Sequence, residues 1–280
     1  MKSCEQYVAP SSDYFVYSPS LTAKESFFYP VCVGHFFYEP GYHQKRSSYD
    51  SFLVMYIQSG ELTVQYEGMT KTATANQFVL LDCYKPHEYY TTASLESLWC
   101  HFDGPMAGRY YELVRSHLGS IFTLADSSSI IGKLRKLYHT FDQNQPIREP
   151  LLSKYLTDIL TDMILYTPSQ TNTGNHSSLI EETVSYINEH FVEELSVNTL
   201  ARQAMLSPYH FIRIFKEETG FTPHEYLINI RLNTAKYMLK TTRDSVKNIC
   251  YNCGFSNESV FCTSFKKNVG MTPAAYRNNE

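Results

Sequence analysis

The chain has 280 residues, of which 43% are hydrophobic and 19% are charged. That length favours two domains, and that composition excludes a chain that is disordered throughout. The longest apolar runs are about six residues, whereas a membrane-spanning helix needs roughly 20, and the amino terminus lacks the apolar core of a secretory signal. The seven cysteines are scattered, as is typical of reduced thiols. We therefore expect a cytoplasmic protein with no membrane partner.

The formal net charge of −4 hides an uneven distribution of charge. Residues 195–280 contain 11 Lys and Arg against 6 Asp and Glu, a net charge of +5, whereas residues 1–194 contain 13 against 22, a net charge of −9. A basic part joined to an acidic part indicates, weakly on its own, that one of the two binds a polyanion.

The first part of the chain has the pattern of short, aromatic-rich strands. Apolar or alternating segments at residues 52–57, 62–66, 77–81 and 98–102 are each followed by a turn signal or a proline. Short strands at a spacing of about 8–12 residues are typical of an all-β sandwich or barrel. We expect such a domain over residues 1–128.

From residue 129 the hydrophobic period becomes helical. Apolar residues recur at three- and four-residue steps over 130–141 and again over 151–164, with Pro146 and Pro150 between the two stripes. The second stripe is wide, so it either packs on its own barrel or also buries apolar surface against a second subunit. We expect a helical dimerisation segment over residues 129–166.

A polar stretch follows this segment. Residues 167–178 contain no large apolar side chain, which is typical of a flexible linker between domains. Beyond the linker, residues 179–280 are helical by pattern, and Ser196, Ser207 and Thr222 mark helix starts.

An internal repeat is the most informative feature of this helical part. Each copy predicts a short helix, a tight turn with a serine N-cap and a helix of about twelve residues, which together form a helix-turn-helix. We place the two units at about 195–220 and 244–270. Upstream, Leu200, Ala201 and Ser207 recur as Ile249, Cys250 and Ser256 with an offset of 49. With a constant offset of 50, Phe211, Phe215, Lys216, Gly220, Thr222, Pro223 and Tyr226 recur as Phe261, Phe265, Lys266, Gly270, Thr272, Pro273 and Tyr276.

The second helix of each copy has a phenylalanine stripe and an opposite, more polar face. Such a face reaches base edges when the helix lies in a major groove. Two helical hairpins with solvated Lys and Arg could also form an ordinary small α-domain, but the duplication, the basic bias and the capped second helices together favour DNA reading. The polar faces carry Tyr209, Ile212, Arg213 and Lys216 in the first copy and Ser259, Cys262, Thr263 and Lys266 in the second.

The segment from about 179 to 278 resembles the DNA-binding domain of the AraC/XylS family of bacterial transcription regulators. The resemblance implies seven helices, with a long helix over about 223–240 that joins two helix-turn-helix units, and recognition helices that enter successive major-groove segments on one face of double-stranded DNA. It rests on Leu200, Ala201, Ser207, Pro208, Phe215, Lys216, Gly220, Thr222, Pro223, Arg231, Leu232, Ala235, Gly254, Phe255, Phe265, Lys266, Gly270, Thr272, Pro273 and Tyr276.

The resemblance also assigns roles to single residues. Arg213 is the first choice for a guanine contact, because its fork matches O6 and N7. Lys216, Lys266 and Lys267 are expected to contact phosphates, which orient the protein without specifying sequence. The residues placed against bases are Tyr209, Ile212 and Arg213 in the first unit and Glu258, Ser259, Cys262 and Thr263 in the second.

Four residues of the second unit carry expectations of their own: Thr263, Glu258, Cys250 and Cys253. Family members commonly carry a longer basic residue at the position of Thr263, so this unit is expected to read DNA more weakly or to read another sequence. Glu258 either accepts a hydrogen bond from cytosine N4 or caps its helix. The pair Cys250 and Cys253 has no second cysteine or histidine pair nearby, so we expect no zinc site.

The β-rich segment, about 20–125, resembles more loosely the cupin-like effector domain that many family members carry. The fold class implied for the whole chain is α+β: a cupin-like β-barrel with flanking helices, followed by an all-α domain of two helix-turn-helix units. Such a barrel encloses a cavity for one small ligand. The resemblance rests on Ser59, Gly60 and Glu61, on Glu67 and Gly68, on Lys85, Pro86 and His87, and on Trp99, His101 and Phe102.

Aromatic and planar polar side chains in this segment predict the ligand class. Sugars are bound by aromatic faces together with planar polar groups, and a small polar effector such as a sugar fits these residues as a set, although each alone could be a core aromatic. The candidate ligand-binding residues are Tyr42, His43, Tyr56, His87, Tyr89, Trp99 and His101.

Catalysis is not expected. Cupin enzymes hold a metal through a close histidine pair, an acid and a later histidine, whereas the four histidines here are spread out and no carboxylate has ligand spacing. We find no nucleophile motif and no phosphate loop. No catalytic residue, metal or cofactor is therefore expected. The histidines in question are His35, His43, His87 and His101.

These observations predict a cytoplasmic, ligand-responsive, sequence-specific DNA-binding transcription regulator that pairs as a homodimer through the helix near 151–166. The family usually activates transcription through RNA polymerase, but the residues leave activator and repressor open. Two alternatives stay open as well. One is a cupin-type small-molecule enzyme with a helical oligomerisation tail, and the other is a constitutive DNA-binding protein whose barrel only dimerises.

Overall fold

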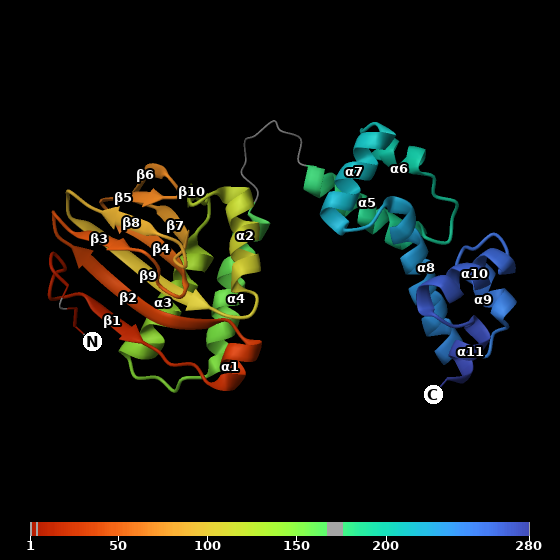
Figure 1. The fold of residues 1–280 in the computed structure, drawn as a ribbon, viewed down its shortest axis with the longest axis horizontal. Coiled ribbons are helices and arrows are strands. Elements are labelled where there is room, and N and C mark those ends of the chain that lie inside the picture. Colours follow the sequence, from red (N-terminus) through yellow and green to blue (C-terminus); the bar gives the residue numbers. More distant parts are fainter. Residues whose placement is uncertain (1, 4, 167–175, 280) are drawn as a thin grey trace. The chain divides into compact units, whose positions relative to one another are not determined.

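The computed structural model describes residues 2–3, 5–166 and 176–279, which fall into two compact units, Met1–Ser169 and Gln170–Glu280. Each unit has its own set of secondary-structure elements, which Figure 1 labels. Most of the predicted linker, residues 167–175, lies outside the described residues.

The N-terminal unit is a two-sheet structure with helices. Its strands are β1 (Asp13–Val16), β2 (Tyr29–Tyr38), β3 (His43–Arg46), β4 (Phe52–Ser59), β5 (Glu61–Tyr66), β6 (Met69–Thr74), β7 (Gln77–Asp82), β8 (His87–Tyr90), β9 (Leu95–Asp103) and β10 (Ile121–Thr123), and its helices are α1 (Leu21–Ser26), α2 (Ala107–Leu118), α3 (Ser128–Asp142) and α4 (Glu149–Leu165).

The strands form two antiparallel sheets. One has six strands in the order β1-β2-β9-β4-β7-β10, and the other has four in the order β3-β8-β5-β6. The chain passes from one sheet to the other at Gly60, where φ is +84° and a Cβ would lie 2.2 Å from the carbonyl oxygen of Ser94. Among the described residues no strand pairing joins the two sheets into a closed barrel, so the predicted β-barrel takes the form of a sandwich.

The two faces of the six-stranded sheet bury different side chains, as the two-residue period of a strand requires. Phe52, Val54 and Tyr56 of β4 pack in a core with α2, α3 and α4, whereas Leu53 and Met55 of the same strand pack against the four-stranded sheet. Figure 1 shows these three helices on one side of the unit.

The apolar stripes predicted over 130–141 and 151–164 are buried in the helix-covered core. Leu134 of α3 and Leu156 of α4 are almost fully enclosed, and Lys133 of α3 forms a 2.7 Å ion pair with Asp162 of α4. Two apolar residues at the ends of α4, Leu151 and Leu165, stay exposed. The wide stripe on α4 therefore packs mainly on its own unit.

Helix α2 lies inside the region that the sequence pattern predicted as strands. Ala107, Tyr111 and Val114 recur at helical spacing and are buried against the sheet. Because this stripe is short and comes directly after the strand-like segment at 98–102, its helical period was not recognised in the sequence.

The C-terminal unit is helical throughout its described residues, 176–279, and consists of seven helices, the number that the family resemblance implied. The longest, α8, coincides with the helix expected over about 223–240. The helices are α5 (His176–His190), α6 (Val197–Gln203), α7 (Pro208–Thr219), α8 (Pro223–Thr241), α9 (Val246–Asn252), α10 (Glu258–Val269) and α11 (Pro273–Asn278).

Each helix-turn-helix has its own hydrophobic core, and α8 contributes to both. Leu227 of α8 packs in the first core, and Leu232 and Leu239 pack in the second. The repeat extends to ring geometry, because the ring of Tyr226 stands edge-on to Phe215 at 5.6 Å and that of Tyr276 stands edge-on to Phe265 at 5.5 Å.

The caps of the two recognition helices correct one detail of the predicted repeat. The Ser207 side chain caps α7 by accepting from the backbone N–H of His210. In the second copy Asn257, not Ser256, is the N-cap of α10, and its side chain accepts from the N–H of Val260 at 2.9 Å. The predicted serine cap of this copy is therefore wrong, because the offset of 50 already holds at the cap.

The two helix-turn-helix units meet at a close backbone contact. Gly254, in the turn after α9, has φ of +77°, and a Cβ on it would lie 2.6 Å from the carbonyl oxygen of Val192. Arg231 of α8 donates hydrogen bonds of 2.7 Å each to the carbonyl oxygens of Phe191 and Glu193 in the same segment. We call Gly254, Arg231 and the segment 191–193 the junction.

Candidate nucleic-acid interface and effector cavity

The predicted reading face of α7 is directed away from the protein core. Tyr209 is 82% exposed and Arg213 is exposed, whereas Phe211 and Phe215 of the same helix are fully buried. Lys216 is exposed as well, and Ile212 is half-buried. The helix therefore presents one apolar stripe inward and exposes Tyr209, Arg213 and Lys216 to solvent.

In the free protein the Arg213 guanidinium is held by Glu217, one turn further along α7. The Nη1 to Oε1 distance is 2.9 Å, and both side chains are more than half exposed, at 53% and 57%. Exposed pairs of this kind contribute little to stability. Arg213 can therefore leave Glu217 for a base at small cost.

The corresponding face of α10 is also exposed. Ser259, Thr263, Lys266 and Lys267 are exposed, and Cys262 is half-buried against the second core. Because Asn257 supplies the capping bond, Glu258 keeps an exposed carboxylate in the first turn of the helix.

Lys266 is exposed on α10, and we expect its side chain to contact a DNA phosphate. Lys266→Ala should weaken binding to all DNA sequences alike and should lower the slope of log K against log salt by about one unit, because one fewer counterion is released. Affinities measured at four salt concentrations check this. Lys154→Ala on α4 is the matched control and should leave the slope unchanged, and an unchanged slope for Lys266→Ala would remove this lysine from the interface.

A cavity of about 110 Å³ lies between the two sheets of the N-terminal unit. Four of the seven candidate ligand-binding residues line it, namely Tyr42, Tyr89, Trp99 and His101. The complete lining is Glu5, Tyr14, Val16, Cys32, Phe36, Tyr38, Tyr42, Arg46, Tyr49, Met55, Tyr89, Trp99 and His101.

The structure does not bring the other three candidates to this cavity. Tyr56 lies in the helix-covered core, on the opposite face of β4, and its hydroxyl donates to Asn76 at 2.9 Å. His43 is exposed on β3 and pairs with Glu88 at 2.8 Å. His87 is buried at the start of β8 and lines a separate depression of the surface. Side-chain alternation explains the placements of Tyr56 and His43. His87 lies on the same face of β8 as Tyr89, and its ring stacks on that of Tyr89 at 6.2 Å, beyond the residues that line the cavity.

His101 lies at one wall of the cavity as a neutral ring. Its Nδ1 is 2.9 Å from the Ser51 hydroxyl, and burial lowers the pKa of the ring to about 3, with the positive charge of Arg46 adding to the shift. At neutral pH, His101 therefore offers hydrogen bonds but no charge.

Sequence reasoning missed several residues of the lining. Arg46 gave no signal, because residues 43–46 are all polar and only the structure shows that Gln44 and Arg46 are half-buried. Glu5 gave no signal, because nothing in the sequence predicts that the amino-terminal segment reaches the cavity.

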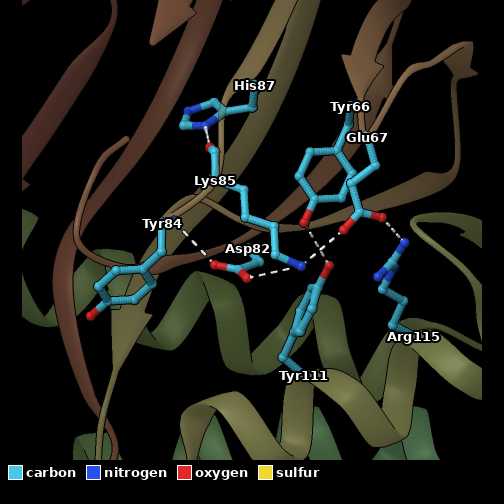
Figure 2. Close-up of polar contacts among 8 residues, drawn as sticks. All are labelled: Tyr66, Glu67, Asp82, Tyr84, Lys85, His87, Tyr111 and Arg115. Carbon is cyan, nitrogen blue, oxygen red and sulfur yellow. Dashed lines mark hydrogen bonds and ion pairs between the residues drawn. The ribbon is translucent and has the colours of Figure 1, made fainter. Parts of the chain in front are cut away.

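A polar network ties the four-stranded sheet to α2, as Figure 2 shows. The hydroxyls of Tyr66 and Tyr111 are 3.0 Å apart, and Lys85 donates to Glu67 at 2.9 Å. Arg115 of α2 also pairs with Glu67. The hydrogen bond from Lys85 holds the pKa of the Glu67 carboxyl below its ordinary value. This network anchors the turn between β5 and β6, where Glu67 and Gly68 have positive φ angles.

Within residues 2–3, 5–166 and 176–279, no group of three or more His, Cys, Asp or Glu side chains is arranged to hold a metal ion. Over the same residues, no helix combines the length and the apolar composition needed to cross a membrane. Cys250 and Cys253 are buried free thiols in the second helix-turn-helix core.

Relatives of the chain were found among curated proteins. It is 29% identical over 153 residues to the HTH-type transcriptional activator RhaS of Escherichia coli (strain SE11), a match that covers 53% of this chain and 55% of the relative. The protein of the same name from Enterobacter sp. (strain 638) is 30% identical over 155 residues, with coverages of 54% and 55%. The chain thus spans about half the length of the curated relatives it matches.

Two solved structures are similar to part of the chain. The DNA-binding domain of AdpA, a global transcriptional factor in complex with a target DNA, is 35% identical and covers 35% of this chain and 89% of that chain, with a TM-score of 0.35. The C-terminal domain of AraT, a response regulator from Geobacillus stearothermophilus, is 28% identical with coverages of 38% and 89% and a TM-score of 0.36. At such TM-scores these likenesses add nothing to the family matches.

Two family models match the chain, one in each unit. Residues 29–160 match the AraC-like ligand binding domain, and residues 200–279 match a helix-turn-helix domain. The first range contains the cavity, and the second contains both recognition helices. The chain therefore belongs to the AraC family in both of its units, as its sequence predicted.

Proposed function

We propose that this chain is a sequence-specific DNA-binding transcription regulator whose activity is controlled by a small-molecule effector. The observation that carries the proposal is the duplicated exposed face. In both α7 and α10 the phenylalanines are fully buried, while Arg213 and Lys266 are exposed on the other side. A helix that buries one stripe and exposes basic side chains on the other fits a major groove.

Roles within the DNA interface follow from side-chain chemistry. Arg213 reads guanine, and the shorter Thr263 at the second unit contributes less discrimination. Lys216, Lys266 and Lys267 contact phosphates. The remaining members of the reading faces are Tyr209, Ile212, Glu258, Ser259 and Cys262.

The effector is a small polar molecule such as a sugar, and the cavity between the sheets holds it. Tyr42, Tyr89, Trp99 and His101 supply the aromatic faces and planar polar groups. The effector regulates only if it binds one arrangement of the two units more tightly than another. We assign the chain no catalytic role. Turnover of a small molecule by the purified chain, with metals supplied, would favour the alternative cupin-type enzyme with a helical oligomerisation tail.

Assembly and location are part of the same proposal. The regulator acts in the cytoplasm as a homodimer, and exposed apolar side chains on α4, Leu151 and Leu165, belong to the dimer contact. It activates transcription through RNA polymerase, in keeping with the relatives, which are named as activators.

Genome-wide footprinting with the purified full chain tests the proposal. We expect protected sites that share a sequence and contain major-groove segments roughly 34 Å apart, one turn of B-DNA. Binding without preference for any sequence would contradict it.

A thermal-shift screen with small polar molecules tests the effector separately. A ligand at 100 times its Kd should raise the free energy of unfolding by about 2.7 kcal/mol. Specific DNA binding combined with no shift across a broad panel would support instead a constitutive DNA-binding protein whose N-terminal unit only dimerises.

A further inference from the structure

The cavity between the sheets contains a cation that forms no ion pair with a described residue. Arg46, the last residue of β3, is half-buried, and its guanidinium lies 4.9 Å from the centre of the Tyr49 ring. No side-chain hydrogen bond or ion pair joins it to another described residue. Charged groups that leave water normally have a hydrogen-bonded partner. The guanidinium therefore has five N–H donors and no acceptor from the described chain.

The carboxylate in the cavity lining acts on Arg46 without an ion pair: burial lowers the pKa of the guanidinium, but electrostatic interactions with Tyr89, Tyr42 and Glu5 raise it overall. Glu5 is exposed, and its Oε2 accepts a hydrogen bond from the Tyr42 hydroxyl at 3.0 Å. It forms no ion pair with the guanidinium. An anion that entered the cavity would meet attraction from Arg46 and repulsion from Glu5, so the two residues should affect its affinity in opposite directions.

Trp99, another residue of the lining, also has a hydrogen-bond donor without an acceptor. Trp99 is only 8% exposed, and its Nε1 is buried without a hydrogen-bond partner. The indole lies over Gly34, where any Cβ would come within 2.3 Å of it. An indole N–H can only donate, and buried donors are rarely left unpaired. Arg46 and Trp99 thus require the same thing of a ligand, namely oxygen atoms that accept hydrogen bonds.

We propose that this cavity binds a small monocarboxylic acid, such as a sugar acid or a hydroxy acid, with its carboxylate on Arg46 and its remaining oxygens within reach of Trp99. The inference rests on the proposed function and names the chemical class of the effector.

Charge and size both favour this class. Arg46 is the one cationic side chain among the described residues of the lining, and His101 is neutral, so a single negative charge can pair with Arg46, whereas the second charge of a phosphate dianion would find no cation and would be repelled by Glu5. The guanidinium fork matches a carboxylate in a bidentate geometry. The volume of about 110 Å³ is below the roughly 300–1,000 Å³ of pockets for drug-sized ligands. Tyrosine and tryptophan rings provide the walls for the carbon skeleton.

The experiment uses acids paired with neutral counterparts of similar shape. The probes are D-galacturonate against D-galactose, D-gluconate against D-glucitol, and L-lactate against propane-1,2-diol, at constant ionic strength with sodium chloride as the blank. Trp99 is the single tryptophan of the chain, so its fluorescence reports binding in this cavity directly. Calorimetric titration of the full chain gives the affinities.

We expect at least one acid to bind at least about ten-fold more tightly than its neutral counterpart and to change the Trp99 emission. Arg46→Gln should lower the affinity for that acid about ten-fold or more, and Arg46→Lys should recover part of it. Glu5→Gln should raise it. Lys45→Gln, which removes an exposed cation from the neighbouring position of β3, is the matched control and should leave it unchanged.

Three results would overturn the inference: a response to neutral probes only, no response to any acid, or equal binding by the wild type and the Arg46→Gln variant. Each can be told apart from failure of the proposed function, because specific DNA binding by the same preparations is measured in parallel. Circular dichroism of the Arg46 variants verifies that they are folded.

Discussion

Gly254→Ala should lower the free energy of unfolding of the C-terminal unit by about 2–5 kcal/mol. The left-handed conformation, with φ of +77°, costs an L-residue about 1–2 kcal/mol. The new Cβ would also lie 2.6 Å from the carbonyl oxygen and 2.7 Å from the Cα of Val192, both backbone atoms, and overpacking of this kind costs about 1–3 kcal/mol more. The backbone of segment 191–193 cannot withdraw easily, because Arg231 holds it by two hydrogen bonds.

Gly270→Ala separates the two contributions. Gly270 has a similar φ of +84°, but nothing lies within 4 Å of a Cβ placed there, so this variant should show only the conformational cost of about 1–2 kcal/mol. Chemical denaturation followed by circular dichroism measures both variants, and the transition seen by Trp99 fluorescence in the N-terminal unit should not move. If Gly254→Ala and Gly270→Ala lowered the free energy of unfolding by the same amount, the backbone at the junction would have moved away from the new Cβ with no measurable loss of stability.

Gly254→Ala also tests how the two reading faces are held. The junction joins the turn before α10 to the segment that follows α5, so it sets the position of one helix-turn-helix relative to the other. We expect the variant to lose specific DNA affinity even at temperatures where it remains folded. Retained specificity would show that the junction does not position the recognition helices.

Arg213→Ala should lower specific DNA binding by about 1–3 kcal/mol, which is about 5- to 150-fold in affinity, while non-specific binding falls far less. A bidentate contact to O6 and N7 of guanine discriminates between bases, whereas a phosphate contact does not. Competition binding to a footprinted site and to a scrambled duplex, at one salt concentration, measures the difference. Equal losses on both duplexes would exclude Arg213 from reading bases.

Glu217→Ala is the matched control for this variant. It removes the partner of Arg213 in the free protein without touching the guanidinium. Because exposed pairs contribute little to stability, we expect an unchanged fold and equal or slightly tighter DNA binding once a negative charge beside the phosphates is lost. A large loss of specific binding would mean that Glu217 is needed to orient Arg213.

Local patterns predicted the C-terminal unit well for a physical reason. Helix caps, positive-φ glycines and the helical period depend on residues only a few positions apart. The duplication also shows the same pattern in two copies, so each copy supports the interpretation of the other. Gly220 and Gly270, which recur at the same place in the two copies, both adopt left-handed C-cap conformations. The N-cap at Asn257 was not predicted, because Ser256, one position earlier, matches the serine of the first copy by residue type.

The N-terminal unit depended more on tertiary structure. The pattern of 52–57 predicted a buried strand, and β4 is one, but a strand buried on both faces has no polar side to show which residues look into the cavity. Met55 faces the four-stranded sheet and Tyr56 faces the helices. This orientation depends on how the second sheet and the helices cover the two faces of β4, and it cannot be read from the strand alone. Candidates chosen by residue type alone therefore divided between the two cores.

By itself, then, the sequence determined the domain classes, the duplicated helix-turn-helix units and most of their caps, because these depend on interactions between near neighbours in the chain. Only the tertiary structure decided that Glu5, Arg46 and Trp99, which lie far apart in the sequence, line one cavity, and that Gly254 touches Val192. Contacts of this kind depend on how sheets and helices pack against each other, and no local period records them.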